Sequence, residues 1–308
     1  NEKTLIKRGL TKGKDYESII ITQNSHAGYY PGAAPLTIKL MFSIDGQKIL
    51  GAQIVGTEGV DKRIDTLAVA MRLGAGIKEL KTLELAYAPP YSSAKDPVNM
   101  AGFVAENLIS GIVKFSEWDE IEKNTAAMVL DVREDIELMA FSLPNAKHIP
   151  LGQLRNRLNE LDHDKEIITF CAIGVRAYNA ARILMQNGFK KVKVYPSGMK
   201  FYKSTHYQQD ATPIYEAASY SDSGYMHTGS MLKAAKRINC SGLQCPFPLA
   251  KVFEAMNELK ENDIIEVTAS DPGFTKDIDA WCKHTGNILI ASEKHGDEYI
   301  TRVKKKSE

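Results

Sequence analysis

Residues 167–176 read Ile-Ile-Thr-Phe-Cys-Ala-Ile-Gly-Val-Arg, an apolar run that ends in a cysteine and leads into a helical pattern over residues 175–186. The run predicts a buried parallel strand, and ligands of such sheets gather at the carboxyl ends of strands. Amides at a helix N-terminus favour the thiolate of Cys171, and Gly174 lets them converge on its sulfur. We therefore expect Cys171 to be a nucleophile and Arg176 to hold an anionic substrate, with an inert buried thiol as the alternative. The rest of the predicted substrate loop is Ala172, Ile173 and Val175.

Apolar runs at residues 127–130 and 192–195 predict further strands beside this one, so residues 113–205 should form an α/β domain with a parallel sheet. The loop Cys-x-x-Gly-x-Arg resembles the active-site loop of rhodanese-type sulfurtransferases. The same resemblance extends to Leu130-Asp131-Val132-Arg133-Glu134, to Ala146-Lys147-His148-Ile149-Pro150-Leu151 and to Tyr195-Pro196-Ser197-Gly198. It implies that Cys171 carries a persulfide and that Asp131 and Arg133 are structural.

Residues 1–112 have the pattern of an antiparallel α+β domain. Apolar and polar residues alternate over residues 36–44, Asp45-Gly46 predicts a hairpin turn, and residues 48–55 predict the return strand. Apolar residues at helical spacing predict a helix over residues 60–71. A second helix is expected from Pro97 to Ser110, with the proline in its first turn.

Two motifs give this first domain a family resemblance. They are His26-Ala27-Gly28-Tyr29-Tyr30-Pro31-Gly32-Ala33 and the stretch from Tyr87 to Pro97. Both resemble the dimerisation domain of pyridine nucleotide–disulfide oxidoreductases, nearest to the coenzyme A-disulfide reductase and NADH-dependent persulfide reductase branch. The resemblance implies a homodimer through residues 1–112, in which Tyr29 and Tyr87 contact coenzyme A in the partner subunit's site. Tyr30 and Tyr91 are rivals for that role, and packing of a dimer interface is the alternative for each.

The third domain is expected at residues 236–308, after a linker at residues 206–235. A helical pattern over residues 247–259 follows Cys245-Pro246-Phe247-Pro248, which resembles the Cys-Pro-x-Pro motif of TusA-like (SirA-like) sulfur carriers. We expect a small two-layer α/β sandwich in which Cys245 lies at a helix N-terminus, and the resemblance implies that it accepts and passes on sulfane sulfur. Cys240 either resolves a persulfide on Cys245 or fills a strand end.

The composition limits the partners. Among 308 residues, 39 are Lys or Arg and 38 are Asp or Glu, so a net charge of +1 gives no electrostatic reason to expect nucleic acid or an anionic membrane. No run of apolar residues is long enough to span a bilayer, and there is no secretory signal pattern. Four separated cysteines fit a cytoplasmic protein and show no metal-ligand spacing.

Dinucleotide binding is not expected from this chain. The glycines from Gly51 to Gly59 have the wrong spacing for a Rossmann motif and lack a strand-to-helix context. We therefore expect no cofactor on this chain and interpret it as the C-terminal part of a larger flavoprotein. The resemblance implies FAD, NAD(P)H and coenzyme A for that parent.

The predicted function is sulfane-sulfur transfer by a rhodanese-type sulfurtransferase. Cys171 would take sulfur from thiosulfate, polysulfide or coenzyme A persulfide and pass it to Cys245 or to a thiol. One alternative is a coenzyme A-disulfide reductase in which the added domains only dock. The other is a sulfur carrier that feeds a biosynthetic partner.

Overall fold

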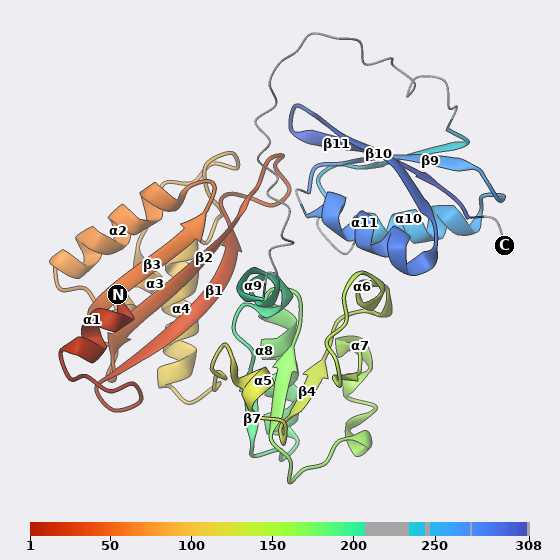
Figure 1. The fold of residues 1–308 in the computed structure, drawn as a ribbon. Coiled ribbons are helices and arrows are strands. Elements are labelled where there is room, and N and C mark those ends of the chain that lie inside the picture. Colours follow the sequence, from red (N-terminus) through yellow and green to blue (C-terminus); the bar gives the residue numbers. More distant parts are fainter. Residues whose placement is uncertain (207–233, 244–246, 272, 307–308) are drawn as a thin grey trace.

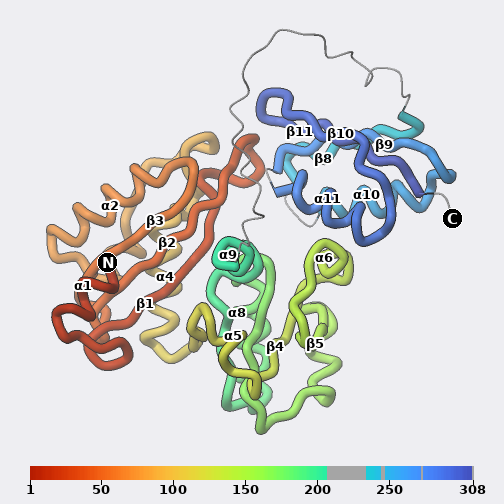
Figure 2. The backbone as a smooth tube through the Cα atoms, in the orientation of Figure 1, coloured from red at the N-terminus to blue at the C-terminus, as the bar shows by residue number. Residues whose placement is uncertain are grey.

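The computed structural model describes residues 1–206, 234–243, 247–271 and 273–306. They form three sheets, each with its own helices and core, which follow one another along the chain (Figures 1 and 2). The predicted multidomain combination of antiparallel α+β, parallel α/β and a small α/β sandwich is confirmed. Most of the predicted linker, residues 207–233, lies outside the described residues, as does Cys245.

The first sheet has the antiparallel order β1-β2-β3, and its core lies between the strands and helices α2, α3 and α4. Strand β1 and helices α1 and α3 were not predicted; β1 contains three consecutive isoleucines, 19–21, instead of an alternating pattern. The predicted hairpin at Asp45-Gly46 is present between β2 and β3. The elements are α1 (Glu2–Lys7), β1 (Tyr16–Asn24), β2 (Pro35–Ser43), β3 (Ile49–Gly56), α2 (Val60–Arg72), α3 (Ile77–Thr82) and α4 (Pro97–Ile109).

The second sheet is parallel, with the order β5-β4-β6-β7 and β6 at its centre. One core cluster lies between the sheet and α8, and another lies on the opposite face beside α9, so both faces are covered. With both faces covered, all four residues of β6 are buried, including Thr169. The elements are α5 (Glu120–Lys123), β4 (Met128–Asp131), α6 (Asp135–Ala140), β5 (Lys147–His148), α7 (Leu151–Leu154), the 3-10 turn η1 (Leu158–Glu160), β6 (Ile167–Phe170), α8 (Val175–Gln186), β7 (Val192–Val194) and α9 (Gly198–Thr205).

The third sheet is mixed, with the order β10-β11-β9-β8, and only the β8–β9 pair is parallel. Helices α10 and α11 pack on the sheet around the fully buried Trp281. The elements are β8 (Lys236–Cys240), α10 (Phe247–Asn257), β9 (Ile264–Ala269), α11 (Phe274–Thr285), β10 (Ile288–His295) and β11 (Glu298–Lys304).

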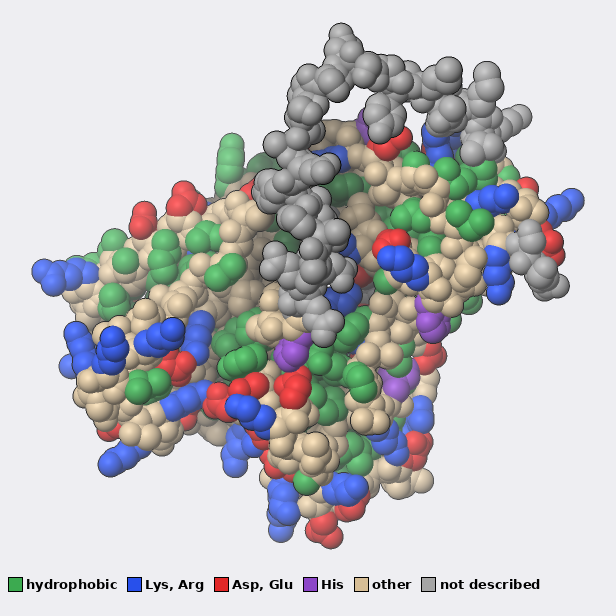
Figure 3. Space-filling model, in the orientation of Figure 1, with side chains coloured by type: hydrophobic (Ala, Val, Ile, Leu, Met, Phe, Trp, Pro, Cys, Tyr) green, Lys and Arg blue, Asp and Glu red, His purple; other side chains and the backbone are tan. Residues whose placement is uncertain are grey.

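The second and third sheets meet through helix α6. Met139 and Ala140 of α6 pack against the core cluster of the third sheet. Lys203 of α9 adds an ion pair to Asp277 of α11 at 3.6 Å. On the visible face of the molecule, cationic and anionic side chains occur on all three parts (Figure 3). The contact through α6 places the third domain over the carboxyl end of β6, where the site described next is found.

Candidate functional site

Cys171 lies where the sequence places it, directly after β6 and before α8. Its side chain is only 1% exposed, yet it forms part of the wall of a cavity of about 560 Å³. The backbone N–H of Gly174 donates a hydrogen bond to Sγ at 3.1 Å. An amide N–H directed at this sulfur can stabilise negative charge that develops there in a reaction.

The loop is held in place by the start of helix α9. The amide of Met199 donates to the carbonyl of Cys171 at 2.8 Å, and that of Lys200 donates to Ala172 at 3.1 Å. Gly198 makes this approach feasible, because a Cβ there would lie 2.1 Å from the Cys171 carbonyl oxygen. Gly174, with φ +102°, also needs the conformational freedom of glycine. Two glycines therefore fix the loop against α9.

Arg176 reaches the cavity, but its guanidinium group is already paired. Its Nη1 and Nη2 donate to the Glu137 carboxylate at 2.6 and 2.8 Å. Burial lowers the pKa of Arg176, but Glu137, with contributions from Cys171 and Glu134, raises it, and the net pKa lies above its usual value. Sequence reasoning missed Glu137; its one local signal is its place three residues after Glu134, whose amide it caps at 2.9 Å.

Residues of all three domains line the cavity of Cys171. The predicted loop residues Ala172, Ile173 and Val175 line it directly, whereas Gly174 lines a smaller neighbouring cavity of about 190 Å³. The described charged residues of the larger cavity are four acids and two bases: Glu134, Glu137, Asp271, Asp277, Arg176 and Lys200. Two of these acids are ion-paired, Glu137 with Arg176 and Asp277 with Lys203 of α9.

The predicted carrier cysteine cannot be placed, because Cys245 lies outside the described residues. Phe247, two positions further along the chain, begins α10 and lines the same cavity as Cys171. Asp271, Gly273 and Asp277, from the region of α11, also line it. The third domain therefore provides one wall of the cavity next to the Cys171 thiol.

Cys240 and Cys282 are buried core residues of the third domain. Cys240 ends β8 and is 0% exposed, and burial raises its pKa. Burial, with a contribution from Asp279, raises the pKa of Cys282 to about 12. These surroundings favour the strand-end interpretation of Cys240, and its resolving role stays a prediction.

Asp131 and Arg133 form a buried ion pair below the site. The Arg133 guanidinium donates to the Asp131 carboxylate at 2.6 to 3.0 Å and to the Phe141 carbonyl at 2.9 Å. Arg133 is 0% exposed. The pair agrees with the structural role that the sequence resemblance implied.

Tyr29 and Tyr87 lie together on the first domain, with their hydroxyl groups 2.6 Å apart. Both side chains are exposed, and the hydrogen bond between the two hydroxyl groups raises the pKa of Tyr87. Neither tyrosine is among the residues lining the Cys171 cavity. The two residues that the sequence singled out therefore form one exposed pair, separate from the thiol site.

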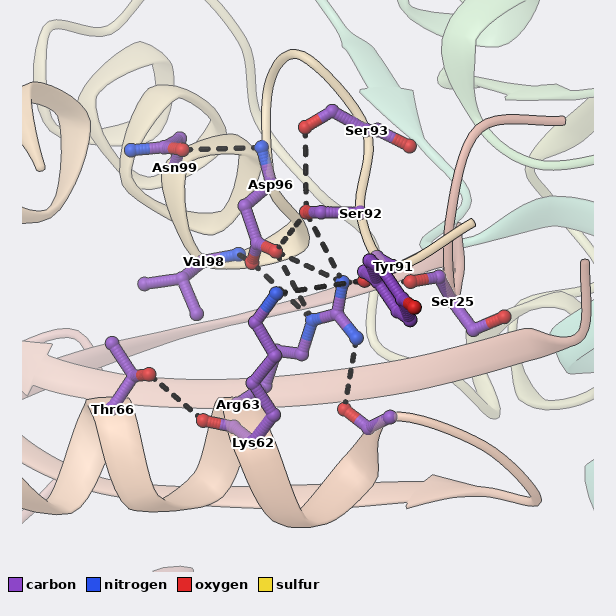
Figure 4. A network of polar contacts seen from close by, with 11 residues as sticks. Ser25, Lys62, Arg63, Thr66, Tyr91, Ser92, Ser93, Asp96, Val98 and Asn99 are labelled. Atoms are coloured by element: carbon purple, nitrogen blue, oxygen red, sulfur yellow. Dashed lines mark hydrogen bonds and ion pairs between the residues drawn. The ribbon is translucent and has the colours of Figure 1, made fainter. Parts of the chain in front are cut away.

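A buried polar cluster fixes the two segments that carry these tyrosines (Figure 4). Arg63 donates to Asp96 at 2.9 Å and to the Ser25 carbonyl at 2.7 Å, and Ser92 donates to Asp96 at 2.6 Å. The amide of Ala27 adds a bond to the Ser92 carbonyl at 2.9 Å. Burial raises the pKa of Asp96. The hydrogen bonds that Asp96 accepts and the charge of Arg63 lower it by more than that, so the net pKa lies below its usual range.

The glycines from Gly51 to Gly59 lie along β3 and at the N-terminus of α2. Contrary to the sequence expectation, β3 does lead into helix α2, so a strand-to-helix context exists. However, the guanidinium of Arg63 donates to the Gly59 carbonyl at 3.1 Å, and a Cβ on Gly59 would lie 2.1 Å from Arg63 Nη1. The Arg63 side chain therefore occupies the space beside Gly59.

The residues that the structure describes contain no group of three or more His, Cys, Asp or Glu side chains that could hold a metal ion. None of their helices has the length and apolar character required to cross a bilayer.

Three protein-family models match successive parts of the chain. The pyridine nucleotide-disulphide oxidoreductase dimerisation domain matches residues 1–97. The rhodanese-like domain matches residues 117–205, and sulfurtransferase TusA matches residues 236–305.

Individual relatives agree with these matches. The coenzyme A disulfide reductase of Staphylococcus epidermidis is 45% identical over 101 residues, which are 33% of this chain and 23% of that protein. The Bacillus anthracis CoADR-RHD structure is 46% identical with a TM-score of 0.62, and the NAD-dependent persulfide reductase from A. fulgidus is 40% identical with a TM-score of 0.60. Each alignment covers 66% of this chain and 36% of the solved chain.

The chain thus spans about a quarter of the curated relatives' length and about a third of the solved ones. The chain is built from a pyridine nucleotide-disulphide oxidoreductase dimerisation domain, a rhodanese-like domain and a TusA domain, and it is related to coenzyme A disulfide reductases and NAD-dependent persulfide reductases.

Proposed function

We propose that this chain relays sulfane sulfur from Cys171 to Cys245, as part of an FAD- and NAD(P)H-dependent persulfide, polysulfide or coenzyme A-disulfide reductase. One observation carries the proposal: Cys171 and Phe247 line the same cavity. Only one residue separates Phe247 from Cys245 in the sequence. A direct relay requires the donor and acceptor sulfur atoms to approach each other, and a shared wall between the two domains is consistent with such a transfer.

The first step loads Cys171. Its thiolate attacks the outer sulfur of a sulfane donor, the donor's S–S bond breaks, and the leaving group departs with the electron pair. The Gly174 amide, 3.1 Å from Sγ, stabilises anionic sulfur at that position. In the second step the Cys245 thiolate attacks the terminal sulfur of the persulfide, and Cys171 leaves as a thiolate. No net oxidation or reduction occurs in either transfer.

Mass spectrometry tests the relay. The full chain is incubated with polysulfide, and sulfur on each cysteine is mapped by peptide in the wild type, in Cys171→Ser and in Cys282→Ser as a matched control. We expect one sulfur on Cys171, a second on Cys245, and loss of the second only in Cys171→Ser.

Other outcomes of this experiment separate the alternatives. Equal loading of Cys245 in Cys171→Ser would contradict the relay and favour an independent carrier for a biosynthetic partner. Loading of neither cysteine would favour a reductase in which the rhodanese-like and TusA domains only dock.

The exposed tyrosine pair supports a coenzyme A role for the first domain. We propose that residues 1–112 form a homodimer and that Tyr29 and Tyr87 contact coenzyme A at the partner subunit's site. Their hydroxyls, 2.6 Å apart, leave further donor and acceptor positions for an amide-containing ligand. In the intact reductase, Tyr87→Phe should raise the KM for coenzyme A disulfide, whereas Tyr91→Phe should leave it unchanged. Sedimentation of this chain tests the dimer.

A further inference from the structure

We infer that the TusA domain has a defined docking surface on the rhodanese-like domain, and that docking there favours sulfur transfer from Cys171 while it hinders loading of Cys171 by protein-borne donors. The inference rests on the proposed sulfur relay and adds a docking equilibrium that separates its two steps. The docking surface consists of Met139 and Ala140 of α6 and Lys203 of α9. The partner that fits it is the side of the third domain formed by α10 and α11 (Figures 1 and 2).

The docking surface makes apolar and charged contacts. Met139 and Ala140 are partly buried and pack against the core cluster of the third domain. Lys203 Nζ lies 3.6 Å from the Asp277 carboxylate of α11 and 5.2 Å from the centre of the Phe141 ring. Interfaces between domains of one chain permit relative motion unless they are large and hydrophobic. Because this one includes an ion pair in which the Lys203 side chain is 38% exposed, we expect the TusA domain to dock reversibly.

The docked TusA domain borders the route to Cys171. Phe247 and Asp277 line the cavity of about 560 Å³ that Cys171 also lines, and the Cys171 side chain is 1% exposed. The third domain also reaches the first one, since a Cβ on Gly242 would lie 3.8 Å from the Tyr29 carbonyl oxygen. With the TusA domain docked, a sulfur donor must therefore enter a cavity enclosed by three domains.

Donors of different size respond differently to this enclosure. Inorganic polysulfide is a short chain of sulfur atoms, which a cavity of about 560 Å³ admits with the domain docked. A persulfide on the surface of another protein brings a folded body that needs the space of the TusA domain. In both reactions the Cys171 thiolate attacks the outer sulfur, the donor's S–S bond breaks, and the rest of the donor leaves with the electron pair. Docking therefore hinders only the protein-borne donor.

Sulfur transfer to the carrier has the opposite requirement. The docked state places Phe247, the first residue of α10, in the wall of the Cys171 cavity. A tethered domain that is also docked presents its groups at a higher effective concentration than one that is only tethered. Weaker docking should therefore slow transfer from Cys171 while it speeds loading by a protein-borne donor. A general folding defect would slow both steps.

Two variants of the full chain weaken docking from different helices. Lys203→Glu replaces the ion pair to Asp277 with repulsion, and Ala140→Glu puts a charge where α6 packs against the third domain. Lys190→Glu is the matched control, because Lys190 is exposed and precedes β7, at the end of the parallel sheet opposite Cys171. Hydrogen exchange measures docking directly. The six-residue helix α6 should exchange at least about threefold faster in both docking variants, since a short helix opens more readily without its packing partner.

Sulfur loading and transfer are then measured by peptide-mapped mass spectrometry. With persulfidated serum albumin as donor, both docking variants should load Cys171 about three- to tenfold faster than the wild type, whereas loading from inorganic polysulfide should change less than about twofold. Single-turnover transfer from loaded Cys171 to Cys245 should be about tenfold slower in both. The control variant should match the wild type in all three rates.

Other outcomes separate this inference from the function on which it rests. Unchanged exchange of α6 in both docking variants would show that the surface is not occupied in solution. Faster exchange with an unchanged donor ratio, or with undiminished transfer, would show that docking does not separate the two steps. Each of these results would overturn the inference and leave the sulfur relay intact. Failure of both donors to load wild-type Cys171, or absence of sulfur on Cys245, would instead contradict the proposed relay itself.

Discussion

Cys171 and Cys240 are both almost fully buried thiols at the carboxyl ends of strands, but their surroundings differ. Cys171 receives the Gly174 amide at 3.1 Å and borders a cavity. Cys240 is packed in the apolar core of the TusA domain, where burial raises its pKa. Exposed area does not separate the two residues, since their values are 1% and 0%. The two thiols differ in a directed amide and an adjoining space, which are the features that we expect of a reactive cysteine.

The largest difference between the two cysteines is expected in the sulfur-transfer rate after each is replaced by alanine. We expect Cys171→Ala to lower sulfur transfer from a persulfide donor to a thiol acceptor by at least about a thousandfold, because the nucleophile is lost. Cys240→Ala should change the rate by less than about threefold and act on stability instead. Steady-state sulfurtransferase rates measure both. A loss of similar size in Cys240→Ala would assign Cys240 a resolving role and break the comparison.

The second largest contrast is expected in the alkylation rates of the cysteines. With iodoacetamide at about pH 8, Cys171 should react at least about a hundredfold faster than Cys240 and Cys282, because a raised pKa leaves little thiolate on a core cysteine. The pKa of about 12 for Cys282 makes its thiolate especially scarce. Peptide-mapped labelling over time gives the three rates. Comparable labelling of all three in the folded protein would show that the cavity gives Cys171 no advantage.

Gly198, at the start of α9, should contribute to stability because it lets this helix approach the Cys171 loop. We expect Gly198→Ala to lower the free energy of unfolding by about 2–4 kcal/mol, since its Cβ would meet the Cys171 carbonyl at 2.1 Å and its φ is +60°. Gly188→Ala is the matched control, because Gly188 also has a positive φ but nothing within 4 Å, and it should cost about 1 kcal/mol. Urea unfolding measures both. An equal decrease in the free energy of unfolding for both variants would mean that the Cys171 loop can shift to accommodate a Cβ at position 198.

Alkaline pH should affect the core thiols. The folded-state pKa of Cys282 is raised, so an unfolded chain loses this proton at lower pH than the folded chain does. From about pH 9 upward the unfolded state therefore binds fewer protons, and the free energy of unfolding should fall, by about 2 kcal/mol at pH 10.5. Cys282→Ala should flatten this decline between about pH 9 and 10.5 in urea titrations. The same slope in both proteins would contradict burial as the source of the raised pKa.

Local sequence signals predicted the strand and helix around Cys171, because the apolar run, the cysteine and the helical spacing are contiguous. Helix α8 begins and ends where the pattern placed it, at Val175 and Gln186. The family motifs likewise identified all three domains. Features that depend on a few neighbouring residues were thus accessible without a structure.

Features that depend on residues far apart in the sequence could not be predicted without a structure. Arg176 was expected to offer its charge to a substrate, and nothing near it in the sequence indicates Glu137, 39 positions earlier. The bond between Tyr29 and Tyr87, 58 positions apart, also requires the folded backbone around Arg63 and Asp96. Such pairings follow from tertiary geometry, which periodicity does not encode.

Helix α6 contacts both the Cys171 site and the TusA domain, a connection that the sequence does not indicate. The Glu137 carboxylate on this helix holds Arg176, and Met139 and Ala140 pack into the core of the TusA domain. Thermodynamic linkage requires that any coupling through this helix be reciprocal. If docking of the TusA domain tightens the Glu137–Arg176 pair, an anion that captures Arg176 must loosen the docking by the same factor. Anion binding at Arg176 and docking of the TusA domain would then be two coupled equilibria that share helix α6.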